Sequence, residues 1–170
     1  ANYTYGNSKV YNEGTSSINT SNWLNMEAVS SRNNLPLTTS DFDMGHRIYA
    51  LASKKFSYAK GHMATTITFA YNGQSGSPYS YVMNGAAFIG DGGTFNDLMY
   101  IPTAAELQGQ TFLANTVSGV TYTPQQQKDA LEAYITKDKY LSKNRGKFAD
   151  RNGARLPFTH NLDLKLAQDF

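Results

Sequence analysis

An alternation of apolar and polar side chains, with a period of two residues, constrains this chain more than any other feature. Between residues 156 and 170 the even positions are mostly apolar and the odd positions are mostly polar or charged. Residues 42–58 and 63–71 alternate in the same way, and a shorter pattern surrounds Tyr3 and Tyr5. Because successive side chains of a β-strand point to opposite faces, each stretch predicts a strand with one apolar face. About four long strands result, at about residues 1–11, 42–58, 62–75 and 156–170.

The predicted strands are long. Strands of globular proteins usually span about 5–6 residues, whereas a transmembrane strand needs roughly 9–11 tilted residues with aromatic girdles at both ends. Aromatic side chains stand at such positions, namely Phe42 against Phe56 and Tyr58, and Phe158 against Phe170. At about 3.3 Å per residue and a tilt near 40°, the span from Phe42 to Phe56 covers roughly 35 Å along the membrane normal. A half-buried strand of a soluble β-protein fits the alternation equally well, so the strand pattern leaves both interpretations open.

The lengths of the connections favour the membrane interpretation. Residues 59–62 join the second and third strands tightly, whereas the other connections run from about residue 12 to 41 and from about residue 76 to 155. Loops of this length are rare in compact domains, but outer-membrane barrels pair short periplasmic turns with long extracellular loops. The sequence therefore predicts an all-β chain that forms an antiparallel segment of a transmembrane β-barrel.

Four strands are too few to close such a barrel. The smallest transmembrane barrels have about eight strands, and each unpaired backbone group at an open edge costs several kcal/mol in hydrocarbon. We therefore expect the missing strands to come from the rest of a longer polypeptide or from other subunits.

One short helix is predicted inside the last loop. Thr123 has the features of an N-cap, with Pro124 at the first helical position and Gln126 three residues after the cap, as in a capping box. The residues that then recur at helical spacing are Gln127, Ala130, Leu131, Tyr134 and Ile135. We expect this helix to pack onto its own loop.

Composition excludes several kinds of site. The chain has no cysteine, which excludes disulfides, thiolate zinc sites and a cysteine nucleophile. A net charge of +2 gives no strong attraction to nucleic acid. The basic residues between positions 137 and 151 are interrupted by Asp138 and Asp150, which is typical of a solvated loop. No run approaches the 18 or more apolar residues of a transmembrane helix.

A weak candidate for a metal site follows residue 90. Asp91, Asn96 and Asp97 could offer oxygens to Ca²⁺, but their spacing differs from that of an EF-hand loop, and a glycine-rich turn is the favoured interpretation. No acidic pair points to a shared cleft, so we expect neither an enzyme nor a bound cofactor. The three histidines lack metal-ligand spacing; they are His46, His62 and His160.

Two groups of residues are weak candidates for substrate binding. Asn72, Asp163 and Lys165 lie on the polar faces of predicted strands and would line a water-filled lumen. Tyr79 and Tyr81 stand in the last loop, where aromatic rings could stack on a sugar or a peptide. Packing of the loop onto itself explains these rings as well, and it is the favoured interpretation.

Several longer segments carry a family resemblance. They are NYTYGNSK near the start, SDFDMGHRIYALASKKFSYAKG at residues 40–61, TTITFAYNGQSGSPYSYV at residues 65–82, NDLMYIP at residues 96–102 and ALEAYITKDKYLSKNRGKFADRNGARLPFTHNLDLKLAQDF at residues 130–170. These segments resemble TonB-dependent transporters of Bacteroidota, in the broad group of SusC-like and Oar-like receptors. The last segment is the most specific, and the resemblance spans nearly the whole chain.

The resemblance implies a barrel of roughly 22 strands, with this chain as a C-terminal part of its wall and a plug domain elsewhere. Such receptors import bulky nutrients, such as glycans or peptides, across the bacterial outer membrane with energy passed on by TonB. The chain has no recognisable TonB box or plug and lacks the strands expected after Phe170, so the segment alone is not expected to transport. The implied partners are the remainder of the barrel and its plug, TonB through the missing N-terminal part, outer-membrane lipid, and a SusD-like or other surface lipoprotein, but not nucleic acid.

Two alternatives stay open. A soluble or surface-exposed β-rich binding module would bury the apolar faces in a sandwich and stay monomeric without detergent. A structural barrel subunit of an outer-membrane assembly would use the same wall without transport. Co-purification with TonB or a lipoprotein lid would separate a transporter from a structural subunit.

Overall fold

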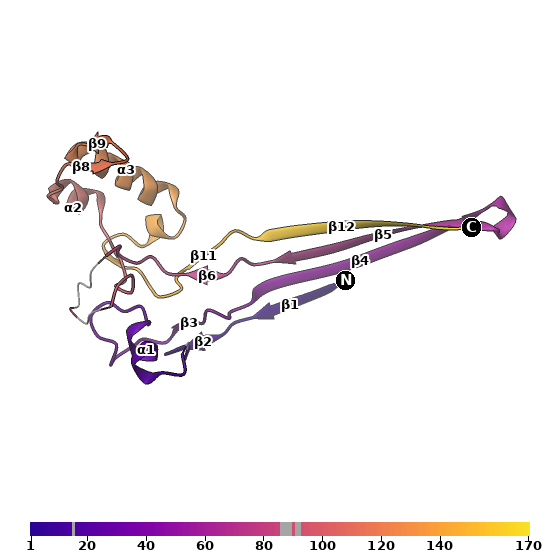
Figure 1. Ribbon diagram of the computed structural model, residues 1–170, viewed down its shortest axis with the longest axis horizontal. Helices are drawn as coiled ribbons and strands as arrows, with labels where there is room; N and C mark the ends of the chain where they lie inside the picture. Colours follow the sequence, from indigo (N-terminus) through magenta and orange to yellow (C-terminus); the bar gives the residue numbers. More distant parts are fainter. Residues whose placement is uncertain (15, 86–89, 91–92) are drawn as a thin grey trace. The chain divides into compact units, whose positions relative to one another are not determined.

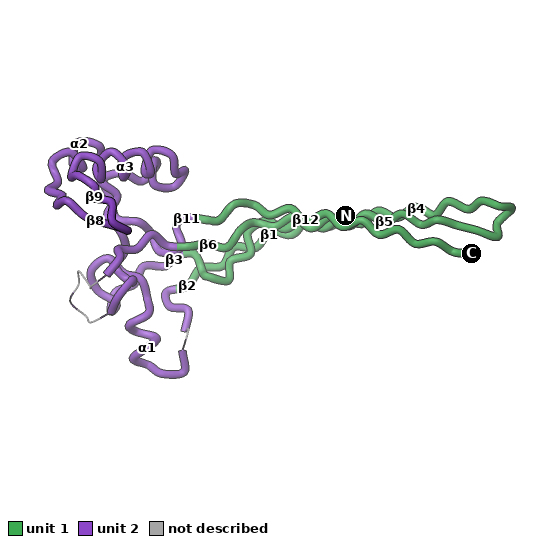
Figure 2. Tube along the Cα trace, turned by 45° about the horizontal axis from the view of Figure 1, so that its top comes forward, with its two compact units in different colours: residues 1–10, 39–79, 155–170 green, residues 11–38, 80–154 purple. Residues whose placement is uncertain are grey.

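The computed structural model describes residues 1–14, 16–85, 90 and 93–170, and the chain divides into two compact units (Figure 2). Unit 1 comprises Ala1–Val10, Thr39–Tyr79 and Arg155–Phe170, and unit 2 comprises Tyr11–Thr38 and Ser80–Ala154. Strands predominate and helices are few, so the predicted all-β class is confirmed.

Unit 1 contains a four-stranded antiparallel sheet in the order β1-β4-β5-β12 (Figure 1). Its strands are β1 (Asn2–Gly6), β4 (Gly45–Tyr58), β5 (Met63–Gln74) and β12 (Thr159–Asp169). Each strand lies within one of the stretches in which apolar and polar side chains alternate. The alternation therefore identifies the strands, because successive side chains of a strand point to opposite faces of the sheet.

The sheet has two different ends. At one end the 3-10 turn η1 (Ala59–Gly61) closes the hairpin between β4 and β5. Both Ala59 and Lys60 adopt positive φ, at 50° and 56°, a conformation that costs a non-glycine residue roughly 1–2 kcal/mol. The register places Gly6, Gly45, Gln74 and Thr159 together at the opposite end. Every long connection of the chain therefore leaves the sheet from that end.

The strand β4 begins later than the alternation predicts. Phe42 lies in a turn, where its N–H donates to Ser40 Oγ at 3.1 Å and the N–H of Asp43 donates to Ser40 O at 3.1 Å. Gly45 then has a φ of +63°, which glycine adopts readily and other residues do not. Phe42 therefore precedes β4 and does not belong to its pattern of faces.

Short strands lie where the chain enters or leaves unit 1. They are β2 (Lys9–Val10), β3 (Thr38–Thr39), β6 (Pro78–Tyr79) and β11 (Ala154–Arg155). Within unit 1, Arg155 forms an ion pair with Asp43 and donates to Gly76 O at 2.9 Å.

Two predicted strands differ in their bounds from the observed ones. The first predicted strand is split into β1 and β2, and Leu156 and Phe158 precede β12.

Unit 2 holds the α-helices and two short strand pairs. Strand β10 pairs with β7, and β8 pairs with β9, both antiparallel. None of the helices described in the chain is long and apolar enough to cross a membrane. The elements are α1 (Asn19–Leu24), β7 (Tyr100–Ile101), α2 (Ala104–Gly109), β8 (Asn115–Val117), β9 (Val120–Tyr122), α3 (Pro124–Lys137), η2 (Leu141–Lys143) and β10 (Lys147–Phe148).

The helix α3 begins as the sequence predicts, but it is not alone. Thr123 Oγ1 accepts the N–H of Gln126 at 3.3 Å, and Gln126 Oε1 accepts the N–H of Thr123 at 2.8 Å. The same reciprocal device starts α2, where Thr103 and Glu106 exchange these bonds. The expectation of a single helix is therefore wrong: α1 and α2 also interrupt the predicted loops.

The apolar core lies in unit 2. Ile101, Ile135 and Leu141 are fully buried and pack with Ala149, while Leu131 covers one side of the group. Ile135 and Leu131 come from α3, so this helix packs onto its own loop as expected. The tyrosines that pack against the same core are Tyr81 and Tyr140.

Candidate functional site on the two faces of the long sheet

The register of unit 1 gathers apolar residues from all four strands onto one face. Leu162, Leu164 and Leu166 of β12 are 67%, 58% and 65% exposed. The described residues therefore leave these leucines largely uncovered, although burying one such side chain is worth about 1.5–3 kcal/mol. The other apolar and aromatic members of the face, called the apolar face below, are Tyr3, Tyr5, Ile48, Ala50, Ala52, Phe56, Tyr58, Met63, Ile67, Phe69 and Tyr71.

Two tyrosine–histidine pairs mark the loop end of the apolar face. Tyr3 Oη lies 2.7 Å from His46 Nδ1, and Tyr71 Oη lies 2.7 Å from His160 Nδ1. The tyrosine rings at this end are apolar and carry a polar hydroxyl group, as amphipathic side chains at an interface do. A further ring lies against each imidazole, with centroids 4.8 Å apart: Tyr5 on His46 and Phe158 on His160.

The second of these pairs depends on Gly73. This glycine lies opposite His160 in the register and carries no side chain above the sheet. A Cβ at Gly73 would overlap the hydroxyl of Tyr71 and lie 2.9 Å from the ring of Phe158. The Tyr71 side chain therefore extends across the glycine and reaches His160 because this position has no Cβ.

The hairpin end of the apolar face carries a second polar cluster. Tyr58 Oη donates to Gln168 Oε1 at 2.9 Å, and Thr65 Oγ1 donates to the same oxygen at 2.7 Å. Phe56 lies in the same cross-strand row as Thr65. From His46 to Phe56 the strand rises roughly 34 Å, or about 26 Å along a membrane normal at a 40° tilt, comparable to an apolar band of about 25 Å.

The three lumen candidates share the opposite, polar face. Asn72 pairs with Asn161, Asp163 with Ala70, and Lys165 with Thr68. Asp163 and Lys165 thus occupy successive positions of this face along β12, one row apart. Polar contacts on the same face include the Lys55–Asp169 ion pair at 2.8 Å, the Ser53–Thr68 hydrogen bond at 2.8 Å and the bond from Arg47 Nε to Asn72 Oδ1 at 3.5 Å.

Each face has exceptions to its chemistry. Tyr49 and Leu51 lie on the polar face, where Leu51 is 56% exposed. Lys54 lies on the apolar face, in one row with Ile67 and Leu166. A lysine in an otherwise apolar row is the less expected of these exceptions, because its charge must keep a polar partner or water.

The two aromatic candidates lie in different settings. Tyr81 Oη donates to Asp138 Oδ2 at 2.8 Å, and its ring stacks on Tyr140 with centroids 6.1 Å apart and planes 13° apart. The same ring also makes an edge-to-face contact with Tyr134. Tyr79 is half-buried in β6. The Tyr81 ring therefore packs against other side chains of unit 2. A ring that stacks on a ligand needs an open face instead.

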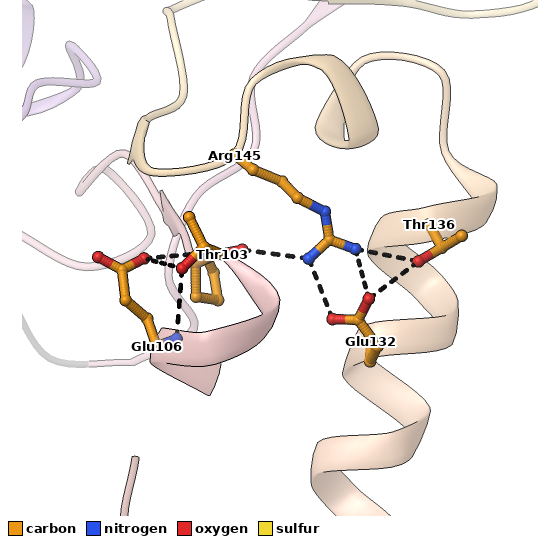
Figure 3. A network of polar contacts seen from close by, with 6 residues as sticks. Thr103, Glu106, Glu132, Thr136 and Arg145 are labelled. Carbon is orange, nitrogen blue, oxygen red and sulfur yellow. Dashed lines mark hydrogen bonds and ion pairs between the residues drawn. The ribbon is translucent and has the colours of Figure 1, made fainter. Parts of the chain in front are cut away.

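A charged network supports the helices of unit 2 (Figure 3). Arg145 forms a two-pronged contact with Glu132, at 2.7 Å and 3.0 Å, and also donates to Thr136 at 3.0 Å and to Pro102 O at 3.3 Å. The hydrogen bond from Arg145 lowers the pKa of Glu132 below its ordinary value. This network ties α3 to the segment before α2, which indicates a structural role.

Asp138 is a second carboxylate whose bonds are internal. Burial alone would raise the pKa of Asp138, but hydrogen bonds from the N–H of Leu141, the Tyr81 hydroxyl and the N–H of Tyr140 outweigh it and lower the pKa. Asp138 therefore organises the turn after α3 and stabilises the core beside it.

The calcium candidates are not assembled into a metal site in the part of the chain that the structure describes. Asn96 and Asp97 are 4% and 5% exposed, and Asn96 Nδ2 donates to Leu24 O at 2.6 Å. Asp91 lies outside the described residues. Among those described, no three His, Cys, Asp or Glu side chains group closely enough to hold a metal.

Asp97 interacts electrostatically with Arg32. Burial lowers the pKa of Arg32, while the charge of Asp97 opposes this shift.

Comparisons with known proteins identify no relative. No protein-family model matches the chain, no curated protein matches it, and no solved structure matches it.

Proposed function

We propose that this chain forms part of the barrel wall of a bacterial outer-membrane receptor, which imports a bulky nutrient with energy derived from TonB. One observation carries the proposal: an exposed apolar face is bounded at both ends by polar and aromatic clusters. In this proposal the apolar face contacts lipid, the polar face lines the lumen, and unit 2 belongs to the extracellular loops.

Lipid accounts for the chemistry of both ends. The loop-end rings and the Tyr58–Thr65–Gln168 cluster would lie at the two membrane interfaces, where aromatic side chains with polar tips concentrate. The aliphatic rows between them would lie in hydrocarbon. A soluble sandwich offers no comparable reason for polar clusters at both ends of one apolar face.

The open edges of the sheet call for further strands. β1 pairs with β4 only as far as Tyr49, so the outer edge of Ala50–Tyr58 has no partner strand among the described residues. Unpaired backbone groups in hydrocarbon cost several kcal/mol each. We propose that the remainder of the barrel supplies these strands.

Transport itself rests on the family resemblance. From it we propose a plug domain, coupling to TonB through a part of the receptor outside this sequence, and a SusD-like or other surface lipoprotein as partner. Asn72, Asp163 and Lys165 are then candidate lumen residues. Co-purification of the native protein with TonB would support transport, and its absence from an intact membrane complex would favour a structural subunit.

Cysteine labelling tests the assignment of the faces. This sequence contains no cysteine, and the native polypeptide without an introduced cysteine supplies the background. Leu164→Cys and Asp163→Cys are adjacent on β12 and differ in face. In the membrane-embedded native polypeptide, a water-soluble maleimide should label the position 163 variant at least about tenfold faster than the position 164 variant, because a thiol in hydrocarbon meets neither reagent nor base. Equal labelling at both positions would overturn the lipid assignment.

The mass of the native polypeptide tests the large-barrel part. A species several times the 18.8 kDa of this sequence, extracted from the outer membrane only with detergent and shifting on a gel when heated, is expected. A free species of 18.8 kDa that needs no detergent would favour the soluble module.

A further inference from the structure

A single lysine interrupts the apolar face. Lys54 occupies the row of Ile67 and Leu166, and among the described strand residues of this face no other Lys, Arg, Asp or Glu is present. A lysine facing lipid costs about 2–4 kcal/mol at the midplane of a bilayer and about 0–1 kcal/mol near its interface. Its position along the strand and its partner therefore decide whether it can be accommodated.

Lys54 stands close to the hairpin end. The next row toward the hairpin contains Phe56, Thr65 and Gln168, and it lies about 7 Å away along the strand. A lysine side chain extends its ammonium toward such an interface while its methylene groups stay on apolar surface. The ammonium can therefore reach the level of lipid phosphates on the hairpin side.

A shallow hollow lies beside Lys54 on the sheet. Its volume is about 190 Å³, and its lining includes Ala52, Lys54, Phe56, Ile67 and Phe69. The lining residues of this face come from three successive cross-strand rows: Ala52 with Phe69, then Lys54 with Ile67, then Phe56. An apolar hollow whose lining holds one cation, one row away from the polar cluster at the hairpin end, matches an acyl chain joined to an anionic headgroup.

We propose that Lys54 and this hollow bind one anionic glycerophospholipid on the hairpin side of the membrane. The acyl chain lies between Phe56 and Phe69, and the ammonium of Lys54 pairs with the phosphate. The inference rests on the proposed function, since it requires the apolar face to contact lipid.

The neighbouring lysine provides a matched control. Lys55 lies on the polar face and pairs with Asp169 at 2.8 Å, so it has the same charge at nearly the same height without facing lipid. Lys54→Gln and Lys55→Gln therefore remove the same charge from opposite faces of the sheet, and Lys54→Arg keeps the positive charge at the proposed site.

The experiment uses Phe69→Trp as a reporter in the native polypeptide reconstituted into vesicles. Brominated phosphatidylglycerol and brominated phosphatidylcholine are compared as quenchers, and the protein without the reporter supplies the background from Trp23 and other tryptophans. We expect about fivefold preferential quenching by the anionic lipid, the factor that one lysine near a membrane surface contributes. Lys54→Gln should abolish the preference, while Lys54→Arg and Lys55→Gln should keep it.

The outcomes separate this inference from the proposed function. Quenching by both lipids without preference, or a preference that survives Lys54→Gln, would overturn the lipid site and leave the lipid-facing wall intact. No quenching by either lipid would overturn both. As a second measurement, native mass spectrometry of the protein without the reporter should show one retained phospholipid fewer in Lys54→Gln than in Lys55→Gln.

Discussion

Units 1 and 2 differ in where their large apolar side chains lie. Unit 2 buries Ile101, Ile135 and Leu141 completely, whereas the leucines of β12 in unit 1 are more than half exposed. The backbone of unit 1 is nevertheless the more regular, because long ladders pair β4, β5 and β12. The difference teaches that unit 2 carries its own apolar core, while unit 1 has regular strand pairing with an apolar face that stays exposed.

Truncating the unit 2 core should have the largest effect. Ile135→Ala removes a fully buried side chain of α3 and should lower the free energy of unfolding of unit 2 by about 2–5 kcal/mol. Hydrogen exchange at the α3 amides measures this change. Leu113→Ala, at a side chain that is 80% exposed, serves as the control and should change it by less than about 0.5 kcal/mol. Equal effects would show that the unit 2 core does not determine its stability.

A charge on the apolar face of unit 1 should have the next largest effect. Leu164→Arg places a cation midway between the two polar clusters. In the proposed arrangement, in which this face contacts lipid, the variant should lower the free energy of unfolding by about 2–4 kcal/mol. Ala70→Arg, in a neighbouring row of the polar face, should cost far less because it meets water. Urea titration of the heat-modifiable form measures both, and a larger loss for Ala70→Arg would reverse the assignment of the faces.

Filling the space under Tyr71 should have a smaller effect. Gly73→Ala introduces a Cβ where the Tyr71 side chain lies and should cost about 1–3 kcal/mol through overpacking. The double variant Gly73→Ala with Tyr71→Ala should recover much of that loss, because the clashing side chain is gone. Additive losses in this cycle, measured by the same urea titration, would argue against the contact.

The smallest effect concerns pH and unit 2. The pKa of Glu132 is lowered in the folded state by Arg145, so its stabilisation is complete above the unfolded value of about 4.3 and is lost as pH falls through the lower folded value. The expected loss is about 0.5–1 kcal/mol. Hydrogen exchange at α3, corrected for intrinsic rates, should show it in the wild type. Arg145→Met should remove this part of the pH dependence, and an unchanged profile would contradict it.

The strands were predictable because alternation is a local property of the chain. Residues 156–170 and 62–75 contain β12 and β5, and Thr123 with Gln126 marks the start of α3. The position of Phe42 was not predictable from alternation, because a turn at Ser40–Asp43 and the positive φ of Gly45 end the pattern. Thr103 and Glu106 also have the spacing of a capping box, so the start of α2 has a local signal in the sequence as well.

The candidate site was predictable only in part. The face on which Asn72, Asp163 and Lys165 lie follows from the alternation of odd and even positions within each strand. The pairs Tyr3–His46 and Tyr71–His160 join residues 43 and 89 positions apart and depend on the register between strands, which this alternation does not fix. The packing of Tyr81 against Tyr140 likewise depends on the fold of unit 2.

The placement of every long connection at one end of the sheet has a kinetic consequence. The β4–β5 hairpin closes across a few residues, but β12 joins β5 only after about 80 intervening residues, and loop-closure entropy grows with the logarithm of that length. Folding of unit 2 brings its chain ends together, because the N–H of Asn152 donates to Ser80 Oγ at 2.9 Å. The effective loop then shrinks to about a dozen residues, which lowers the entropic barrier by about 2 kcal/mol. Unit 2 thus shortens the loop that the β5–β12 pairing must close, and β12 should pair with β5 faster once unit 2 has formed.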